Sequence, residues 1–135
     1  MPVTALHHFT IRCAPDDLPP LLDFYTRVMR LDVAARPEIP APGAWLYAQG
    51  QPIVHLYAHL AHPEAATTPP TGPLDHISFR THGLLEMRSH LSALGVAYTE
   101  APIPGWDIHQ LFLHDPRGLK IEMTFWMNDE VGPDA

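Results

Sequence analysis

The sequence contains an internal repeat, and this repeat limits the folds open to the chain more than any other feature. The segment LHHFTIR at residues 6–12 recurs 68 residues later as LDHISFR at residues 74–80, so His8 and His76 hold equivalent places. Both segments alternate polar and apolar residues, which is typical of a strand with one buried face. Such a repeat predicts two similar modules built from the same elements.

The closing strands of the two halves repeat in the same way. IVHL at residues 53–56 matches KIEM at residues 120–123 at an offset of 67, which aligns His55 with Glu122. On all four strands, the histidine or glutamate lies on the face opposite its apolar neighbours, because side chains two residues apart share a face. Imidazole and carboxylate groups are common ligands of divalent metals. We therefore predict a metal site built from His8, His55, His76 and Glu122.

Each half is predicted to hold four strands and one helix, in the order βαβββ. In the first half the strands lie at residues 3–12, 32–35, 44–48 and 52–58, with a helix from Asp16 or Asp17 to Arg30. In the second half they lie at residues 74–80, 97–100, 108–114 and 119–125, with a helix at 84–94.

The predicted fold class is α+β, with one domain at residues 1–126. Module one covers residues 1–61 and module two covers 74–126. Residues 62–73 are rich in Pro, Thr and Ala, and form a predicted linker. Residues 127–135 are predicted to be a loose acidic tail.

Composition excludes several classes of function. The net charge is −7 with histidines neutral, and no basic run is present to bind the phosphates of nucleic acid or the surface of an anionic membrane. Cys13 is the single cysteine, which excludes an internal disulfide and fits a reducing compartment, so we expect a cytoplasmic protein. The sequence contains neither a signal peptide pattern nor an apolar run long enough to span a bilayer.

Four motifs together resemble those of a known superfamily. They are L-x-H at residues 6–8, FY at 24–25, LDH at 74–76, and DP-x-G-x-x-IE at 115–122. With them the chain resembles the vicinal oxygen chelate superfamily, which includes glyoxalase I, extradiol dioxygenases, methylmalonyl-CoA epimerase, fosfomycin-resistance transferases and bleomycin-resistance proteins. This resemblance implies two βαβββ modules that form a curled mixed sheet around a metal cavity, with helices on the outer face.

The resemblance also implies that the first and last strands of each module supply the ligands, which again are His8, His55, His76 and Glu122. The chain departs from the pattern at His55, where glyoxalase I usually has Glu and the epimerase has Gln. Extradiol dioxygenases use two His and one Glu, which His8, His76 and Glu122 could supply. His55 would then be a cavity histidine that binds substrate or transfers a proton near pH 7.

Further residues are candidates for binding substrate. Gln110 and Phe112 share a strand face, and the resemblance directs this face toward the cavity. Tyr57 shares the face of His55, and Trp45 is a candidate for lining an apolar pocket.

Four other residues are predicted to have structural roles or, in one case, to line a pocket. His7 faces the helix side by strand parity, so we predict a structural histidine. Arg12 and Arg80 are predicted to form salt bridges at the rim of the sheet. Trp106 is predicted to line a pocket or to lie in the core.

We expect a metal-dependent enzyme of the glyoxalase type, a lyase or isomerase, whose small substrate is chelated through neighbouring oxygens. One divalent ion, Fe, Ni, Co, Zn or Mn, would act as a Lewis acid, with Glu122 and His55 as candidate general bases. One alternative is an extradiol ring-cleaving dioxygenase with Fe(II). A second is a non-catalytic drug-binding resistance protein. Because short two-module chains of the superfamily commonly pair, we also expect a homodimer.

Overall fold

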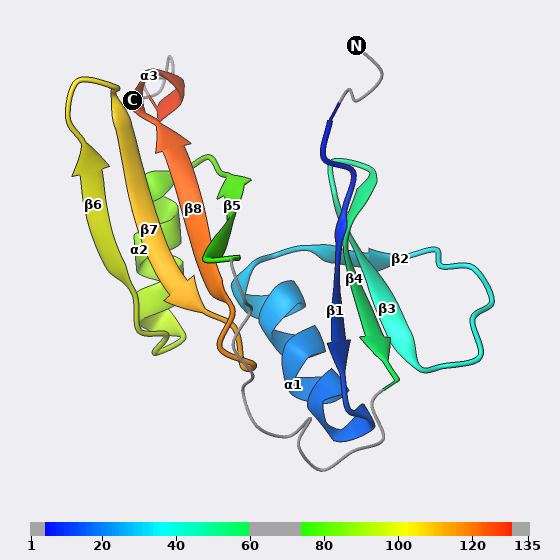
Figure 1. Cartoon of the computed structure of the whole chain (residues 1–135). Helices are drawn as coiled ribbons and strands as arrows, with labels where there is room; N and C mark the ends of the chain where they lie inside the picture. Colours follow the sequence, from blue (N-terminus) through cyan, green and yellow to red (C-terminus); the bar gives the residue numbers. More distant parts are fainter. Residues whose placement is uncertain (1–4, 60–73, 131–135) are drawn as a thin grey trace. The chain divides into compact units, whose positions relative to one another are not determined.

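The structure is a computed structural model that describes residues 5–59 and 74–130 of the chain (Figure 1). Contacts divide the chain into two compact units, Met1–Pro69 and Pro70–Ala135, and each is described by itself below. The boundary falls within the predicted linker at 62–73, which lies outside the described residues.

Unit one contains a four-stranded mixed sheet and a helical segment. Its strands are β1 (Phe9–Cys13), β2 (Asp32–Ala34), β3 (Gly43–Ala48) and β4 (Gln51–Ala58), arranged in the order β1-β4-β3-β2. Strand β1 runs parallel to β4, and the other pairs are antiparallel. Strand β4 is therefore central, and its middle residues are buried on both faces of the sheet.

The helical segment of unit one changes its winding along its length. It begins with the 3₁₀ turn η1 (Pro15–Asp17), continues as α1 (Leu18–Asp23), and ends in the π-helical turn η2 (Phe24–Val28). Prolines are tolerated in the first turn because the N–H they lack has no partner there. Its buried side chains recur at helical spacing; they are Leu21, Phe24, Tyr25 and Val28. The segment lies beside the sheet of its unit (Figure 1). The predicted helix is thus present, but it ends at Val28 and not at Arg30, and its last turn is wider than an α-helical turn.

Unit two repeats this order of elements. It contains β5 (His76–Arg80), α2 (Leu84–Ala93), β6 (Thr99–Ile103), β7 (Ile108–His114), β8 (Lys120–Trp126) and α3 (Met127–Glu130). Its sheet has the order β5-β8-β7-β6, with β5 parallel to β8 and the other pairs antiparallel. The two sheets thus have equivalent strand orders, and the predicted α+β fold of two βαβββ modules is confirmed.

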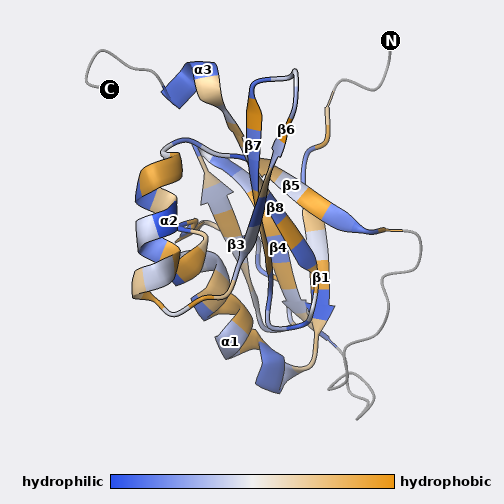
Figure 2. Cartoon of the chain, turned by 90° about the vertical axis from the view of Figure 1, so that its left-hand side faces the viewer, coloured by the Kyte–Doolittle hydropathy of each residue, from blue (hydrophilic) through white to orange (hydrophobic). Residues whose placement is uncertain are grey.

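Helix α2 covers one face of the sheet of unit two. Its buried residues Leu84, Met87 and Leu91 recur every three or four positions. The residues between them are hydrophilic except for the exposed Leu85, and Figure 2 shows both hydrophilic and hydrophobic residues along α2. The helix ends at Ala93, and Gly95 follows its C-cap residue Leu94 with a φ of 69°, which glycine adopts at little cost. The sheet contributes to the core of this unit the buried apolar side chains of β7 and β8, which are Leu111, Leu113, Ile121, Met123 and Phe125. The polar residues between them therefore lie on the face away from α2.

Three differences between the structure and the sequence prediction are larger than a shift of one or two residues. Strand β1 begins at Phe9, so the exposed His7 and His8 precede it. Strand β6 extends through Pro102 into the predicted loop, which is possible because an edge strand can dispense with one N–H donor. Residues 127–130 form the helix α3 where a loose tail is predicted, and the rest of that tail lies outside the described residues. Among the helices described, none has the length and apolar character needed to cross a membrane.

Candidate metal centre

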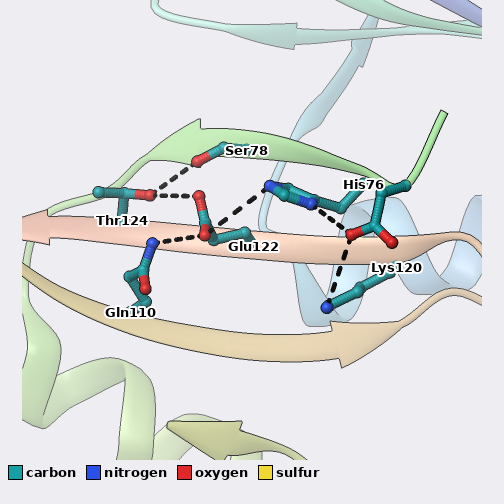
Figure 3. Close-up of polar contacts among 7 residues, drawn as sticks. His76, Ser78, Gln110, Lys120, Glu122 and Thr124 are labelled. Carbon is teal, nitrogen blue, oxygen red and sulfur yellow. Dashed lines mark hydrogen bonds and ion pairs between the residues drawn. The ribbon is translucent and has the colours of Figure 1, made fainter. Parts of the chain in front are cut away.

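In unit two, the predicted ligands His76 and Glu122 lie next to each other on the polar face of the sheet. His76 begins β5, and Glu122 lies in the middle of β8 opposite Ser78. The His76 Nε2 atom is 3.9 Å from Glu122 Oε1, and the two side chains point toward each other (Figure 3). The parallel pairing of β5 with β8 thus brings together one imidazole and one carboxylate.

The other ring nitrogen of His76 is already engaged. His76 Nδ1 lies 2.8 Å from Asp75 Oδ2, and a carboxylate can only accept, so Nδ1 carries the proton. The hydrogen bond from His76, and then the positive charge of Lys120, hold the pKa of Asp75 below its usual value. In the neutral ring, Nε2 is then the nitrogen with the lone pair. A carboxylate behind a histidine is a common supporting arrangement at metal sites.

Glu122 is a buried carboxylate, with 7% of its surface exposed, and both of its oxygens accept hydrogen bonds. Gln110 Nε2 donates to Oε1 at 2.6 Å, and Thr124 Oγ1 donates to Oε2 at 2.9 Å. Thr124 has one hydroxyl proton, so Ser78 Oγ, at 2.7 Å, is the donor in the bond between the two hydroxyls. The carboxylate therefore has a fixed orientation (Figure 3).

In unit one, His55 lies between two other rings. Trp45, its partner across the β3–β4 pair, stacks on one side with ring centroids 3.9 Å apart and an interplanar angle of 9°. His8 stacks on the other side, also at 3.9 Å, with an angle of 12°. His55 Nε2 lies 3.1 Å from the Pro52 carbonyl and must donate to it, which leaves the lone pair on Nδ1.

The surroundings of His55 favour its neutral form. Burial lowers the pKa of His55 most, and the nearby His8 and then His7 lower it further, while the hydrogen bond to Pro52 opposes them. A neutral imidazole at neutral pH can bind a metal ion or accept a proton.

His8 is less firmly placed than the other three predicted ligands. It is exposed, and its Nδ1 lies 2.9 Å from Nδ1 of His7. His7 is also exposed, so the prediction that it faces the helix side is wrong, and the reason is that β1 begins only at Phe9.

The two histidines of unit one cannot bind one ion in the orientation they have here. A metal ion lies in the plane of each imidazole that binds it, and nearly parallel planes 3.9 Å apart do not meet at a shared ion. The ring of His8 would have to turn, which an exposed side chain ahead of a strand can do. His55 is more restricted, since rings cover both of its faces.

The structure brings the predicted ligands together as two pairs, His8 with His55 and His76 with Glu122. Within residues 5–59 and 74–130 it does not form a group of three or more His, Cys, Asp or Glu side chains that could hold a metal. Two donors on one ion, each at about 2.0–2.2 Å, lie roughly 3–3.5 Å apart. The 3.9 Å between His76 and Glu122 is slightly longer, so this pair fits an ion after a small shift.

The predicted substrate-binding residues lie on the same faces as these pairs. Phe112 is opposite Glu122 across β7 and β8, in the place that Trp45 holds opposite His55. Gln110 contacts Glu122 directly, and Tyr57 is partly buried with its ring 5.3 Å from that of His59.

Two of the remaining predictions can be compared with the structure. Arg80 forms the predicted salt bridge, with Asp129 at 2.7 Å, and its guanidinium also lies 4.2 Å from the ring centroid of Trp126. Trp106 is 73% exposed and does not lie in the core.

Sequence reasoning overlooked the residues that hold the ligands in place. Ser78 and Thr124 lie on the predicted ligand faces, so strand parity could have identified them. Asp75 occupies the repeat position that His7 occupies in module one, so comparing the two halves of the sequence could have identified it. The sequence gives no indication that the backbone carbonyl of Pro52 accepts a hydrogen bond from His55.

Comparisons with known proteins agree with the fold described above. The sequence model of the Glyoxalase/Bleomycin resistance protein/Dioxygenase superfamily matches residues 5–123. The chain belongs to this superfamily. "Glyoxylase I 4" of Arabidopsis thaliana is 34% identical over 128 residues, which cover 90% of this chain and 70% of that protein.

Solved structures are similar in fold at low sequence identity. A putative glyoxalase family protein from Bacillus anthracis has a TM-score of 0.71 and 17% identity, with 91% of this chain and 95% of that chain covered. TnmS3, an antibiotic binding protein from Streptomyces sp. CB03234, has a TM-score of 0.66 and 20% identity, with 93% and 98% covered. The same fold thus occurs in chains described as glyoxalases and in a chain described as an antibiotic-binding protein.

Proposed function

We propose that this protein is a metal-dependent enzyme of the glyoxalase type that acts on a small substrate through two neighbouring oxygens. The observation that carries the proposal is the pair of His76 and Glu122, 3.9 Å apart, each already oriented by its own hydrogen bonds. Membership of the superfamily supports it, since its members generally use a divalent metal.

In this proposal His8, His76 and Glu122 hold the ion, and His55 is either a fourth ligand or a base. When bound, a first-row divalent ion would act as a Lewis acid toward the substrate oxygens. Glu122 and the free Nδ1 of His55 are the two groups suited to accept a proton from substrate. Trp45 and Phe112, which flank these two groups, are suited to contact the apolar part of the substrate.

A second candidate function is ring cleavage of catechols by an extradiol dioxygenase with Fe(II). The stacking of His55 between Trp45 and His8 favours it, because a ring covered on both faces is less free to turn toward an ion. Without His55 the donor set is two histidines and one carboxylate, the set found in non-haem Fe(II) oxygenases.

Elemental analysis of protein purified without a metal-chelating tag tests the proposal. We expect about one divalent ion per chain in the parent, and loss of that ion in Glu122→Ala. The matched control is Glu100→Ala, which removes a carboxylate of the same unit that pairs with Arg88 instead. An oxygen electrode with catechols separates the two enzymes, since uptake of oxygen would favour the dioxygenase.

Two results would count against the proposal. A parent protein without metal that also fails to bind added metal would instead favour a non-catalytic binding protein. TnmS3, which has the same fold, is described as an antibiotic binding protein. Metal retained by Glu122→Ala at the level of the parent would mean that the ion binds elsewhere.

A further inference from the structure

In each module, the residue before the first predicted ligand contacts that ligand, but the chemistry of this preceding residue differs between the modules. In module two Asp75 precedes His76, and its Oδ2 lies 2.8 Å from His76 Nδ1. In module one His7 precedes His8, and the two Nδ1 atoms lie 2.9 Å apart. A carboxylate can only accept, so it fixes which nitrogen of the next ring is protonated, whereas an imidazole can donate or accept.

Lys120 holds Asp75 from the neighbouring strand. It is the register partner of His76 across the β5–β8 pair, and its Nζ lies 3.7 Å from Asp75 Oδ2. The same ammonium group lies 5.0 Å from the ring centroid of Phe112. These contacts form a row from Lys120 through Asp75 to His76 and on to Glu122. Figure 3 labels Lys120, His76 and Glu122 of this row.

We propose that Asp75 is a positioning residue that sets the tautomer of His76. By accepting the proton of Nδ1, Asp75 keeps the lone pair on Nε2, which is the atom that faces Glu122. The part of this inference that concerns metal binding rests on the proposed function, whereas the part that concerns the tautomer does not.

The effect is chemically specific because a neutral histidine without a partner prefers to carry its proton on Nε2. In that tautomer the nitrogen facing Glu122 is a donor and has no lone pair for a metal ion. Asp75 therefore opposes the intrinsic preference of the ring. His8, which follows His7 and not a carboxylate, has no equivalent constraint, and its ring stacks on His55.

The tautomer can be read directly in metal-free protein. Long-range proton–nitrogen correlation spectra of ¹⁵N-histidine-labelled protein distinguish the protonated from the bare nitrogen of each neutral ring. We expect His76 of the parent to carry its proton on Nδ1, and His76 of Asp75→Ala to carry it mainly on Nε2. Asp75→Asn keeps an oxygen that can accept but adds an NH₂ that can donate, so its spectrum should show both forms.

Metal affinity supplies the second measurement. Asp75→Ala should bind Zn²⁺ or Ni²⁺ about 10- to 100-fold more weakly than the parent, the loss typical of removing the group behind a ligand histidine. The matched control is Asp23→Ala, which removes an exposed carboxylate paired with Arg27 and so makes the same change in charge. Asp75 is itself 75% exposed, so the variant should keep the parent's unfolding midpoint in urea.

The outcomes separate this inference from the proposed function. An unchanged His76 tautomer in Asp75→Ala would overturn the positioning role, whatever the metal affinity. A changed tautomer with unchanged affinity would show that Asp75 orients a histidine that binds no metal, and would overturn the link to metal binding. If the parent binds no metal at all, the proposed function fails, while the tautomer measurement still tests Asp75.

Discussion

His55 is the residue at which the two enzyme candidates separate, and its surroundings explain why. Its ring is covered on both faces, and the Pro52 carbonyl takes up Nε2, so Nδ1 is the nitrogen that remains available. A ligand role gives the ion four donors from the protein. A base role leaves three, and opens a further coordination position for a second small molecule.

Replacing His55 distinguishes these roles. If His55 is a ligand, His55→Ala should weaken metal binding by about 100-fold or more, since even supporting groups contribute 10- to 100-fold. If it is a base, the variant should keep its metal and lose mainly turnover. Metal titration of the variant alongside the parent measures the first effect, and oxygen uptake with catechols tests the dioxygenase. Unchanged affinity together with oxygen uptake by the parent would contradict the glyoxalase proposal.

The titration of His55 gives a prediction for metal-free protein. Because burial and the neighbouring His8 lower its pKa, His55 should titrate below the usual histidine value of about 6.5. The unfolded chain then takes up a proton before the folded one does, so His55's contribution to the free energy of unfolding is present above about pH 6.5 and is lost as the pH falls. His8→Ala removes both a covering ring and a neighbouring charge, and should raise the pKa of His55. A pKa that stays the same in an NMR titration of the variant would contradict this account.

The residues of the site could be predicted from the sequence better than their hydrogen bonds. The repeat identified His55, His76 and Glu122 because ligand-type side chains recur at one strand position. It could not predict which ring nitrogen is free, because this depends on partners such as the Pro52 carbonyl and the Asp75 carboxylate. Nor could it predict the stacking of His8, which requires the location of the start of β1.

At the scale of elements, the prediction succeeded where local pattern and tertiary packing agree. The strand predicted at residues 108–114 matches β7, which alternates between α2 and the polar face of the sheet. The prediction failed at residues 127–130, whose helix α3 depends on contacts distant in sequence. Met127 N–H donates to the Asp107 carbonyl at 2.9 Å, and the Glu130 carboxylate accepts from Gly83 N–H at 3.0 Å and from Leu84 N–H. No local signal in residues 127–130 predicts these partners.

The contact of α3 with the start of α2 yields a stability prediction. Glu130 satisfies two N–H groups that would otherwise lack partners, and its negative charge lies at the positive end of the α2 dipole. Glu130→Ala should therefore lower the free energy of unfolding by about 0.5–2 kcal/mol, the range measured for lost N-terminal caps. Urea unfolding followed by circular dichroism measures the change.

Glu86 offers the matched control for this cap. It is also an acidic residue of the first turn of α2, so it shares the dipole interaction, but the backbone cap is made by Glu130. Glu86→Ala should cost no more than a few tenths of a kcal/mol. Equal losses in the two variants would mean that charge near the helix end, and not the two hydrogen bonds, stabilises α2.

At the scale of the whole molecule, the duplication gives each module one pair of predicted metal ligands. Unit one supplies a pair of stacked imidazoles, and unit two supplies an imidazole and a carboxylate with fixed orientations. Neither pair alone has the three protein donors of a typical catalytic metal site. The proposed metal site therefore draws its donors from a module one and a module two, and the proposal leaves open whether these belong to the same chain or to two chains.

We predict that the protein is a homodimer, as expected from the resemblance to short two-module chains that pair. Sedimentation at micromolar concentration should give twice the mass of one chain, and a monomer that binds metal fully would contradict the prediction. Mixing two inactive variants, His8→Ala and Glu122→Ala, then tests which chains supply the donors. If the modules exchange between chains, a mixed dimer contains one site with both lesions and one intact site, so refolding the variants together restores up to half a metal ion per chain in those dimers. If each site forms within one chain, every site keeps a lesion and the mixture binds no more metal than the separate variants do.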